Sequence, residues 1–236
     1  MKIKRYNKKS SYAFCFGSEP VKDLLKKKRE RVLKVVFKEE GLKDSNVKKI
    51  FKMVKEKKVD FEINDRLIEK TAFKENTYVV GIFEKYECKL NEKKNHIVLV
   101  NPRNPRNIGT VMRNMVGFGF EDLVLIKPAV DIFQPGAVSS AMGSMFYVNF
   151  RYFDSFEEYK TIFKKHNIYS FMLDGEKEIA EIKFEEPFSL VFGNESKGLA
   201  KKFKKYGKTV FIPHSKNIDS LNLSMSVGIA LYVASK

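Results

Sequence analysis

The feature that most constrains the fold of this chain is the alternation of short apolar runs with amphipathic segments after residue 95. Runs that are apolar along their whole length are typical of strands in a parallel sheet, where helices cover both faces. We therefore predict an α/β domain with a mostly parallel sheet over residues 96–236. Its strands are expected at 97–100, 123–126, 168–173, 189–192 and 209–212, and its helices at 108–118, 156–166, 196–206 and 220–235.

A smaller α/β region precedes this domain. Residues 1–12 are basic and predict a flexible arm, whereas residues 13–83 alternate between helical and strand patterns. Residues 84–95 are polar and aperiodic, as expected of a linker. The sequence thus predicts an N-terminal domain over 13–83, joined by this linker to a larger domain over 96–236.

The net charge indicates a polyanionic partner. The chain has 45 Lys and Arg against 29 Asp and Glu residues, giving +16, and residues 1–90 alone carry 25 basic and 14 acidic side chains. Such an excess favours binding to the phosphates of nucleic acid. The alternative explanation is a lysine-rich composition that places Lys on every solvated surface. The tract Lys26, Lys27 and Lys28 can accordingly contact RNA or form a solvated helix end.

The composition argues against a membrane, secreted or metal-dependent protein. No apolar run approaches the ~18 residues that a membrane-spanning helix needs, and no apolar stretch of a secretory signal follows the basic N-terminus. Two cysteines are too few for a disulfide framework or a zinc site, and the three histidines are dispersed. We expect a soluble cytoplasmic protein without a metal. The fingerprints of dinucleotide-binding and P-loop proteins are also absent.

Three polar loops, rich in glycine and asparagine, follow predicted strands at 101–109, 193–198 and 213–222. Because ligands bind at the carboxyl ends of the strands in an open parallel sheet, we expect the three loops to form one site. Purely structural explanations exist for single residues. Asn107 and Ser220 can cap helices, and Glu195 is favoured by the helix dipole in a first turn. Arg113 and Asn222 can simply lie on the surface.

The order and spacing of three motifs resemble a known family. The motifs are Asn-x-Gly-x-x-x-Arg at 107–113 with Phe-Gly at 118–119, Leu-Val-Phe-Gly-Asn-Glu-x-x-Gly-Leu at 190–199, and Ile-Pro at 212–213 with Ser-Leu-Asn-Leu-Ser at 220–224. Over residues 96–236 the chain resembles the SpoU/TrmH-type RNA 2′-O-ribose methyltransferases of the SPOUT superfamily. Residues 10–83 resemble the small ribosomal-protein-like RNA-binding domain that many members carry in front.

The resemblance implies a C-terminal segment that threads through a loop to form a deep trefoil knot. S-adenosylmethionine would lie in the knot, held by the main chain of the second and third motifs. Family members act as homodimers whose active site is completed by both subunits. The implied cofactor contacts are Gly193, Asn194, Ile212, Pro213 and Leu221. The basic residues expected to bind RNA are Arg103, Arg106, Lys26, Lys27 and Lys28.

A ribose hydroxyl is a poor nucleophile with a high pKa, so its methylation needs a base or strict positioning. No free histidine is expected within the motifs. By resemblance, Arg113 is the base or the activator of the 2′-OH, and Asn107 positions Arg113 or the ribose. Glu195 would orient the site through charge-assisted hydrogen bonds. Ser220 and Asn222 would fix the loop and bind RNA or Arg113.

Two residues depart from the family pattern. Lys216 stands where a glycine is usual, and Ala141 stands where a serine is frequent. Lys216 either changes the backbone conformation of its loop or adds an RNA contact. Neither departure removes a proposed catalytic residue.

We therefore predict an S-adenosylmethionine-dependent RNA 2′-O-methyltransferase that acts on ribosomal RNA, with the basic N-terminal domain positioning the substrate. The preference for rRNA rests on this extra domain and on the lack of the C-terminal extension found in some tRNA-directed relatives. A tRNA ribose methyltransferase is the alternative enzyme. The alternative of another class is a catalytically silent RNA-binding or ribosome-assembly protein, which the intact set of proposed catalytic residues disfavours.

Overall fold

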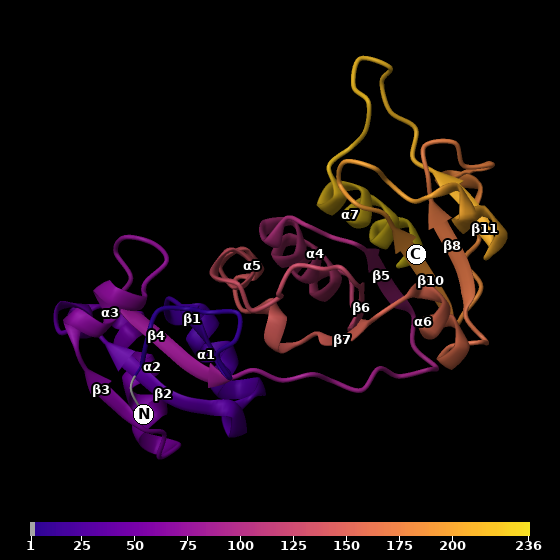
Figure 1. Ribbon diagram of the computed structural model, residues 1–236. Helices are drawn as coiled ribbons and strands as arrows, with labels where there is room; N and C mark the ends of the chain where they lie inside the picture. Colours follow the sequence, from indigo (N-terminus) through magenta and orange to yellow (C-terminus); the bar gives the residue numbers. More distant parts are fainter. Residues whose placement is uncertain (1–2) are drawn as a thin grey trace. The chain divides into compact units, whose positions relative to one another are not determined.

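The computed structural model describes residues 3–236, which form two compact units (Figure 1). Unit 1 contains the residues up to Tyr86 together with Asp131–Tyr147. Unit 2 contains Glu87–Val130 and Val148–Lys236. The chain therefore passes between the units three times, and neither unit is a single continuous stretch of sequence.

Unit 1 is built on a four-stranded sheet in the order β1-β4-β2-β3. Strand β4 runs antiparallel to both of its neighbours, whereas β2 and β3 are parallel. The strands are β1 (Tyr12–Phe16), β2 (Val32–Phe37), β3 (Phe61–Ile63) and β4 (Val79–Glu84). The helices are α1 (Ser18–Lys27), α2 (Ser45–Glu56), α3 (Asp65–Thr71) and α5 (Pro135–Ala141), with 3₁₀ turns at Arg29–Arg31, Glu40–Lys43 and Ser144–Phe146.

Residues 3–11, which the sequence predicts as part of a basic arm, lie against unit 1. Ile3 and Tyr6 pack against its buried core. The backbone N–H of Lys4 donates a hydrogen bond to the hydroxyl of Tyr12 at 2.9 Å. Residues 1 and 2 of the predicted arm lie outside the described residues.

The segment Asp131–Tyr147 packs within unit 1, although the sequence pattern assigns it to the domain over 96–236. Its Phe146 is 2 % exposed, and the centroid of that ring lies 5.2 Å from that of Phe83 in β4. The hydroxyl of Tyr147 donates to a carboxylate oxygen of Asp23 in α1 at 2.9 Å. These contacts join residues far apart in the sequence, so no local pattern predicts them.

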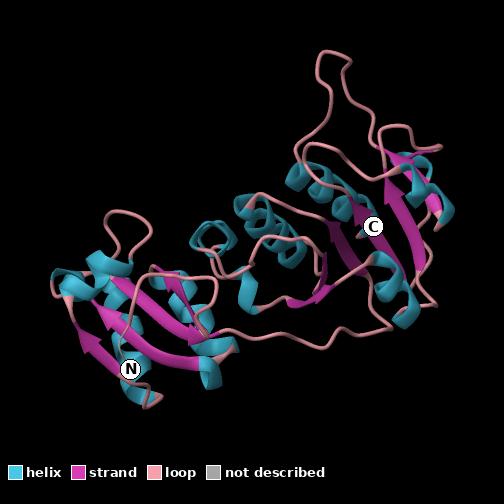
Figure 2. Ribbon diagram, viewed as in Figure 1, coloured by secondary structure: helices cyan, strands magenta, loops and turns pink. Residues whose placement is uncertain are grey.

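Unit 2 contains a seven-stranded sheet in the order β7-β6-β5-β10-β8-β11-β9. In the described part of the chain all its neighbouring strands are parallel, which confirms the predicted α/β class (Figure 2). The strands are β5 (His96–Val100), β6 (Asp122–Ile126), β7 (Asn149–Phe153), β8 (Asn167–Phe171), β9 (Lys177–Glu178), β10 (Phe188–Phe192) and β11 (Lys208–Phe211). The helices are α4 (Pro105–Gly117), α6 (Phe156–Ile162) and α7 (Leu223–Ala234), with 3₁₀ turns at Ile179–Glu181 and Lys201–Lys205.

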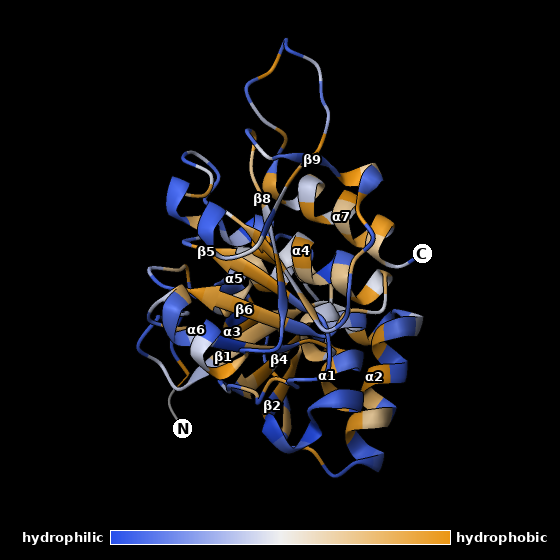
Figure 3. Cartoon of the chain, turned by 90° about the vertical axis from the view of Figure 1, so that its right-hand side faces the viewer, coloured by the Kyte–Doolittle hydropathy of each residue, from blue (hydrophilic) through white to orange (hydrophobic). Residues whose placement is uncertain are grey.

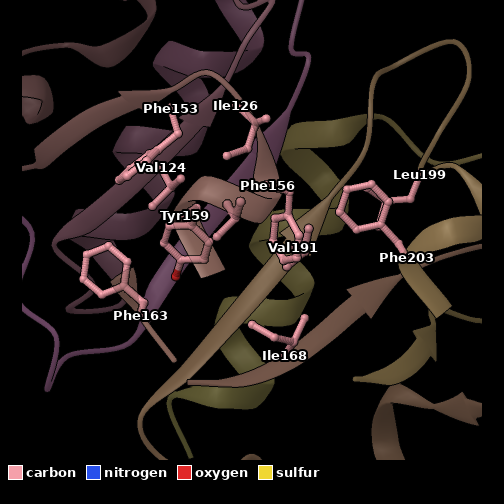
Figure 4. Close-up of a cluster of buried hydrophobic side chains, with 11 residues drawn as sticks. Val124, Ile126, Phe153, Phe156, Tyr159, Phe163, Ile168, Val191, Leu199 and Phe203 are labelled. Atoms are coloured by element: carbon pink, nitrogen blue, oxygen red, sulfur yellow. The ribbon is translucent and has the colours of Figure 1, made fainter. Parts of the chain in front are cut away.

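Both faces of this sheet are buried. On one face, Val124 and Val191 belong to a cluster with Phe156 and Tyr159 of α6 (Figure 4). Successive residues of a strand point to opposite faces, and Leu125, next to Val124, is also fully buried. Burial on both faces explains why these strands are apolar along their length, as the colouring of β5 and β6 in Figure 3 shows.

Two predicted helices of unit 2 differ from the structure. The helix predicted at 196–206 is wrong, because a β-bridge joins Asn194 to Gly198 and only a 3₁₀ turn follows at Lys201–Lys205. Gly198 has a φ of 63°, a conformation that glycine adopts readily and that an α-helix does not contain. The helix predicted at 156–166 ends already at Ile162.

The sequence pattern also fails to predict β1, α5 and β7. Strand β7 lies at the edge of its sheet, and three of its five residues, Arg151 among them, are only half-buried. An edge strand tolerates charged and polar side chains, so the continuous apolar pattern of the central strands is missing there.

Candidate active site

The three polar loops lie at the carboxyl ends of parallel strands, as the sequence predicts. Loop 101–104 joins β5 to α4, loop 193–200 follows β10, and loop 212–222 joins β11 to α7. In Figure 1 the last loop is the long yellow segment that extends beyond the sheet. Strands β5 and β10 are neighbours, which places the first two loops side by side.

Glu195 connects the loop after β10 to the start of α4. Its carboxylate accepts hydrogen bonds from the backbone N–H of Arg103 at 3.1 Å and of Asn104 at 3.0 Å, and from Nδ2 of Asn107 at 3.1 Å. Burial by itself raises the pKa of Glu195, but the hydrogen bonds that its carboxylate accepts outweigh burial, so the pKa is lowered. The carboxylate is therefore charged, and it holds the two loops in a fixed relation.

Asn107 and Asn222 extend this network to the third loop. Nδ2 of Asn222 donates to Oδ1 of Asn107 at 3.3 Å, while Oδ1 of Asn222 caps α7 by accepting from the backbone N–H of Ser224 at 2.9 Å. The N-cap of α4 is Asn104, so Asn107 lies inside that helix and is not its cap. The chain of contacts from Asn222 through Asn107 to Glu195 thus joins all three motifs.

The loop after β10 has a conformation that requires small residues. Nδ2 of Asn194 donates to the carbonyl oxygen of Asn101 at 2.7 Å, and its Oδ1 accepts from the backbone N–H of Ser196 at 3.0 Å. A Cβ atom on Gly193 would lie 2.1 Å from the carbonyl carbon of Gly198, so only glycine fits there. The same loop conformation places Glu195 toward α4.

Arg113 stands apart from this network. It is exposed on α4, and among the described residues its side chain has no hydrogen bond or ion pair. It lies seven residues after Arg106, so the two basic side chains share one face of the helix. The structure therefore brings Asn107, Glu195 and Asn222 together but leaves Arg113 free for a ligand or a second chain.

A cavity of about 420 Å³ opens at the carboxyl ends of β8, β10 and β11. Four of the five predicted cofactor residues line it, namely Gly193, Asn194, Ile212 and Leu221; Pro213 is not among its lining residues. Its apolar walls come from residues such as Phe171, Phe192, Leu199 and Val210. Cavities of this size and character are typical of sites for small molecules and cofactors.

A second cavity, of about 640 Å³, lies beside the first. Its lining includes Arg103, Asn107 and Asn222, which are largely polar groups suited to a polar ligand. The two cavities have six lining residues in common: Asn194, Glu195, Ser196, Ser220, Leu221 and Leu223. The shared lining residues show that the two cavities adjoin, so ligands bound in them would lie next to each other, as transfer of a group between them requires.

Two residues that the sequence analysis missed belong to this region. His214, which lies between the two parts of the third motif, lines the first cavity. The sequence signal for this residue was that His214 lies two residues after Ile212, which is a predicted cofactor contact. Asn114 is the other residue, because its Nδ2 donates to the carbonyl oxygen of Ser224 at 3.0 Å and so fixes the first turn of α7 on α4.

The remaining predicted residues lie elsewhere. Lys27 and Lys28 are in or next to the last turn of α1 in unit 1, with their amines 4.7 Å from the ring centroid of Tyr147 and 5.3 Å from that of Tyr86. Lys26 is exposed in the same turn. Ala141 is buried in unit 1 at the end of α5, whereas Lys216 is exposed in the loop after β11.

Residues 3–236 contain no group of three or more His, Cys, Asp or Glu side chains arranged to hold a metal ion. Within the same residues, no helix has the length and apolar character needed to cross a membrane.

The fold and the cavities define a class of α/β proteins that bind ligands at the carboxyl ends of a parallel sheet. The model of the SpoU rRNA Methylase family matches residues 94–232, which is more than half of the chain. The chain belongs to this family, as the three motifs predict.

Known proteins match different shares of the chain. An uncharacterized tRNA/rRNA methyltransferase of Archaeoglobus fulgidus is 32 % identical over 143 residues, covering 59 % of this chain and 63 % of that protein, so less than two thirds of the relative's length is spanned. The crystal structure of an AdoMet-bound rRNA methyltransferase from Sinorhizobium meliloti matches 95 % of this chain and 87 % of that one, with a TM-score of 0.79 and 24 % identity. A structure on the 2-OH methylation of C/U34 on tRNA matches 61 % of this chain and 95 % of that one, with a TM-score of 0.57 and 31 % identity.

Proposed function

We propose that the protein transfers a methyl group from S-adenosylmethionine to a ribose 2′-OH of RNA. The observation that carries this proposal is the wall shared by the two cavities, where Glu195 and Ser220 face both. Membership in the SpoU rRNA Methylase family supports the same activity.

The first cavity suits S-adenosylmethionine. Its apolar walls match an adenine ring, and Gly193, directly after β10, is among the residues that line it. The main chain at Gly193, Ile212 and Leu221 would hold the cofactor. Asn194 would fix the loop after β10, and Pro213 would fix the start of the loop after β11. When bound, S-adenosylmethionine supplies an activated methyl group on a sulfonium.

The protein contributes positioning more than chemistry. The ionised Glu195 holds the start of α4 through three hydrogen bonds. Asn107, one of the three donors, also accepts a hydrogen bond from Asn222, so the third loop is held as well. A network in which every polar group is satisfied keeps the reacting groups in place without reorganisation during the reaction. Ser220, on the shared wall, would contact the ribose.

Arg113 would activate the 2′-OH. A guanidinium normally stays protonated, so its role is to bind the 2′-oxygen or an adjacent phosphate and to stabilise negative charge on the oxygen while the hydroxyl proton passes to solvent water. Its exposure and its lack of a protein partner in the described chain leave its donors available. Arg106, on the same face of α4, and Arg103, at the rim of the second cavity, would bind the neighbouring phosphates.

We also propose a homodimer formed through α4 and α7. Phe118, Met225 and Tyr232 are large apolar side chains that are 36 %, 57 % and 50 % exposed, and the rings of Phe118 and Tyr232 lie 6.2 Å apart. Exposed apolar residues grouped in this way mark protein interfaces, and a two-fold dimer would bring the same patch of both subunits together. Arg113, on the same helix, would then complete the site of the partner.

Ribosomal RNA is the proposed substrate. The match to the Sinorhizobium meliloti rRNA methyltransferase covers both units, whereas the tRNA-related structure matches only 61 % of the chain but nearly all of its own. Unit 1, which carries most of residues 1–90 with their excess of basic side chains, would position the RNA through Lys26, Lys27 and Lys28. A tRNA substrate remains the second candidate, because the tRNA-related structure is the more identical in sequence, at 31 % against 24 %.

The test is methyl transfer from radiolabelled S-adenosylmethionine to separated rRNA and tRNA fractions from a strain that lacks this gene, with assembled ribosomal subunits as a further substrate. Alkali-stable label in rRNA alone is the expected result. Label in tRNA alone would retain the chemistry and overturn the substrate. Folded protein that binds RNA but labels no fraction would overturn the enzyme and favour a silent RNA-binding scaffold.

A further inference from the structure

His214 is a titratable side chain in the first cavity to which the proposed reaction assigns no role. It lies three residues after the end of β11 and is half-buried. It lines the first cavity but not the second. His214 therefore belongs to the proposed cofactor cavity and not to the proposed ribose cavity, which argues against a role as the base that takes the 2′-OH proton.

One ring nitrogen of His214 is already fixed. Nδ1 lies 2.9 Å from the carbonyl oxygen of Ile212, and a carbonyl oxygen can only accept. Nδ1 must therefore carry the hydrogen, which leaves Nε2 of the neutral ring as an acceptor. Among the described residues, no protein group forms a hydrogen bond with this Nε2. The loop thus presents an oriented acceptor at the cavity.

We propose that Nε2 of His214 accepts a hydrogen bond from the adenosine half of S-adenosylmethionine and is a positioning residue for the cofactor. This inference rests on the proposed cofactor and does not depend on which RNA is methylated. The sulfonium must face the wall shared by the two cavities, so groups that reach His214 lie away from the methyl group. The ammonium of the amino-acid half is better matched by the carboxylate of Asp219, which lines the same cavity; the other carboxylate there, Asp174, is paired with Lys204 at 2.7 Å. The neutral hydroxyl and amine donors of the adenosine half then remain for the imidazole.

The test is calorimetric binding of S-adenosylmethionine and of 5′-methylthioadenosine, which lacks the amino-acid half, to the full chain without RNA. The variants are His214→Ala, His214→Gln and, as a matched control in the same loop, Asn217→Ala. The side-chain oxygen of glutamine replaces Nε2 as an acceptor. Asn217 does not line the cavity, and only its backbone N–H forms a hydrogen bond within the described loop.

His214→Ala is expected to weaken binding of both ligands about three- to tenfold, the effect of losing one hydrogen bond to a neutral group. His214→Gln should restore most of the affinity, and Asn217→Ala should match the wild type. A merely structural role for His214 would not be rescued by glutamine, and unchanged melting temperatures of the ligand-free variants would show that the fold is intact.

Three results would overturn the assignment. Equal affinities for wild type and His214→Ala would remove His214 from the cofactor site while leaving the proposed function in place. Weaker binding of S-adenosylmethionine with unchanged binding of 5′-methylthioadenosine would move the contact to the amino-acid half. Wild-type protein that binds neither ligand would overturn the proposed cofactor and this contact with it.

Discussion

At the scale of single residues, the candidate site depends on one carboxylate. Glu195 accepts hydrogen bonds from two backbone N–H groups and from the side chain of Asn107, and no residue type other than Glu or Asp offers an acceptor-only group of this kind. The sequence motif identifies Glu195, but it does not reveal the partners, because Arg103 and Asn104 donate through their backbones. Every residue except proline has a backbone N–H, so the sequence does not show which of these groups bind the Glu195 carboxylate.

Glu195→Gln is therefore expected to reduce both stability and methyl transfer. The glutamine amide would place a donor against the exposed N–H of Arg103 or of Asn104, so one charge-assisted hydrogen bond is lost at a cost of about 1 kcal/mol. Urea unfolding and turnover measure the two effects. Glu181→Gln, which removes the same charge from an exposed 3₁₀ turn, should leave both unchanged. Wild-type turnover in Glu195→Gln would contradict the role given to the network.

Arg113→Ala is expected to abolish methyl transfer without changing the melting temperature. The side chain is exposed and has no protein partner in the described chain, so its removal breaks no contact within the fold. Arg113→Lys should recover little activity, because an ammonium lacks the planar fork of a guanidinium. Turnover assays and thermal melts on the same preparations provide the comparison. Near-normal turnover in Arg113→Ala would remove this residue from the mechanism.

At the scale of elements, the strands of unit 2 have different chemistry at their two ends. The carboxyl ends carry the candidate site, while the amino ends carry a buried polar cluster. There Nδ1 of His96 lies 2.9 Å from the Tyr159 hydroxyl, and Nδ1 of His166 lies 2.9 Å from the Ser189 hydroxyl. The two imidazole rings are 4.3 Å apart between centroids. This cluster joins β5, β10 and α6 at the opposite end of the sheet from the candidate site.

The cluster predicts that stability falls in mild acid. Burial, with a smaller contribution from His166, lowers the pKa of His96 to about 4, and burial also lowers that of His166. The unfolded chain takes up protons below its ordinary histidine pKa of about 6.5, while the folded chain resists them, so stability is lost from there down toward pH 4. Burial raises the pKa of Asp122, which opposes this loss at the acidic end.

Urea unfolding at pH 7.5 and 5.5 tests this prediction. His96 alone should account for a loss of about 1–2 kcal/mol between these values. His96→Gln, which cannot be protonated, should flatten the dependence. A wild-type stability that does not change between pH 7.5 and 5.5 would contradict the buried, neutral state of these histidines.

A comparison of predicted and observed elements shows which parts of the fold can be predicted from the sequence. Central strands such as β5, β6 and β10 are predicted to within a residue or two, because burial on both faces demands a continuous apolar run. The helix predicted at 196–206 fails because the left-handed Gly198 turns the chain instead. Of the site residues, Asn107, Glu195 and Asn222 are found by motif and spacing. His214 is missed because a histidine in a loop shows no periodicity that separates a cavity wall from open surface.

At the scale of the whole molecule, the two units are not consecutive in the sequence. The segment Asp131–Tyr147 leaves unit 2 after β6, completes unit 1 and returns to form β7. Within unit 1, Nζ of Lys85 lies 3.0 Å from Oδ2 of Asp131, and both side chains are largely buried. Unit 1 is therefore not expected to be complete when residues 1–95 are expressed alone.

Phe146→Ala is expected to destabilise unit 1 selectively. Truncating a buried phenylalanine costs about 3–5 kcal/mol, and this ring packs against Phe83 of β4. Hydrogen exchange read out by mass spectrometry should show faster exchange in β1, β4 and α1, with β5 and β10 of unit 2 unchanged. Exchange that increases equally in both units would contradict the assignment of this segment to unit 1.

The central claim is that the protein transfers a methyl group from S-adenosylmethionine, bound in the first cavity, to a ribose oxygen of RNA bound in the second. The most direct test is mass spectrometry of the nucleosides released from RNA after reaction with the protein and isotopically labelled S-adenosylmethionine. The account predicts label in one 2′-O-methylnucleoside, found on its ribose fragment, and no label from Arg113→Ala. Label on a base fragment, or no labelled nucleoside from wild-type protein that binds both cofactor and RNA, would contradict it.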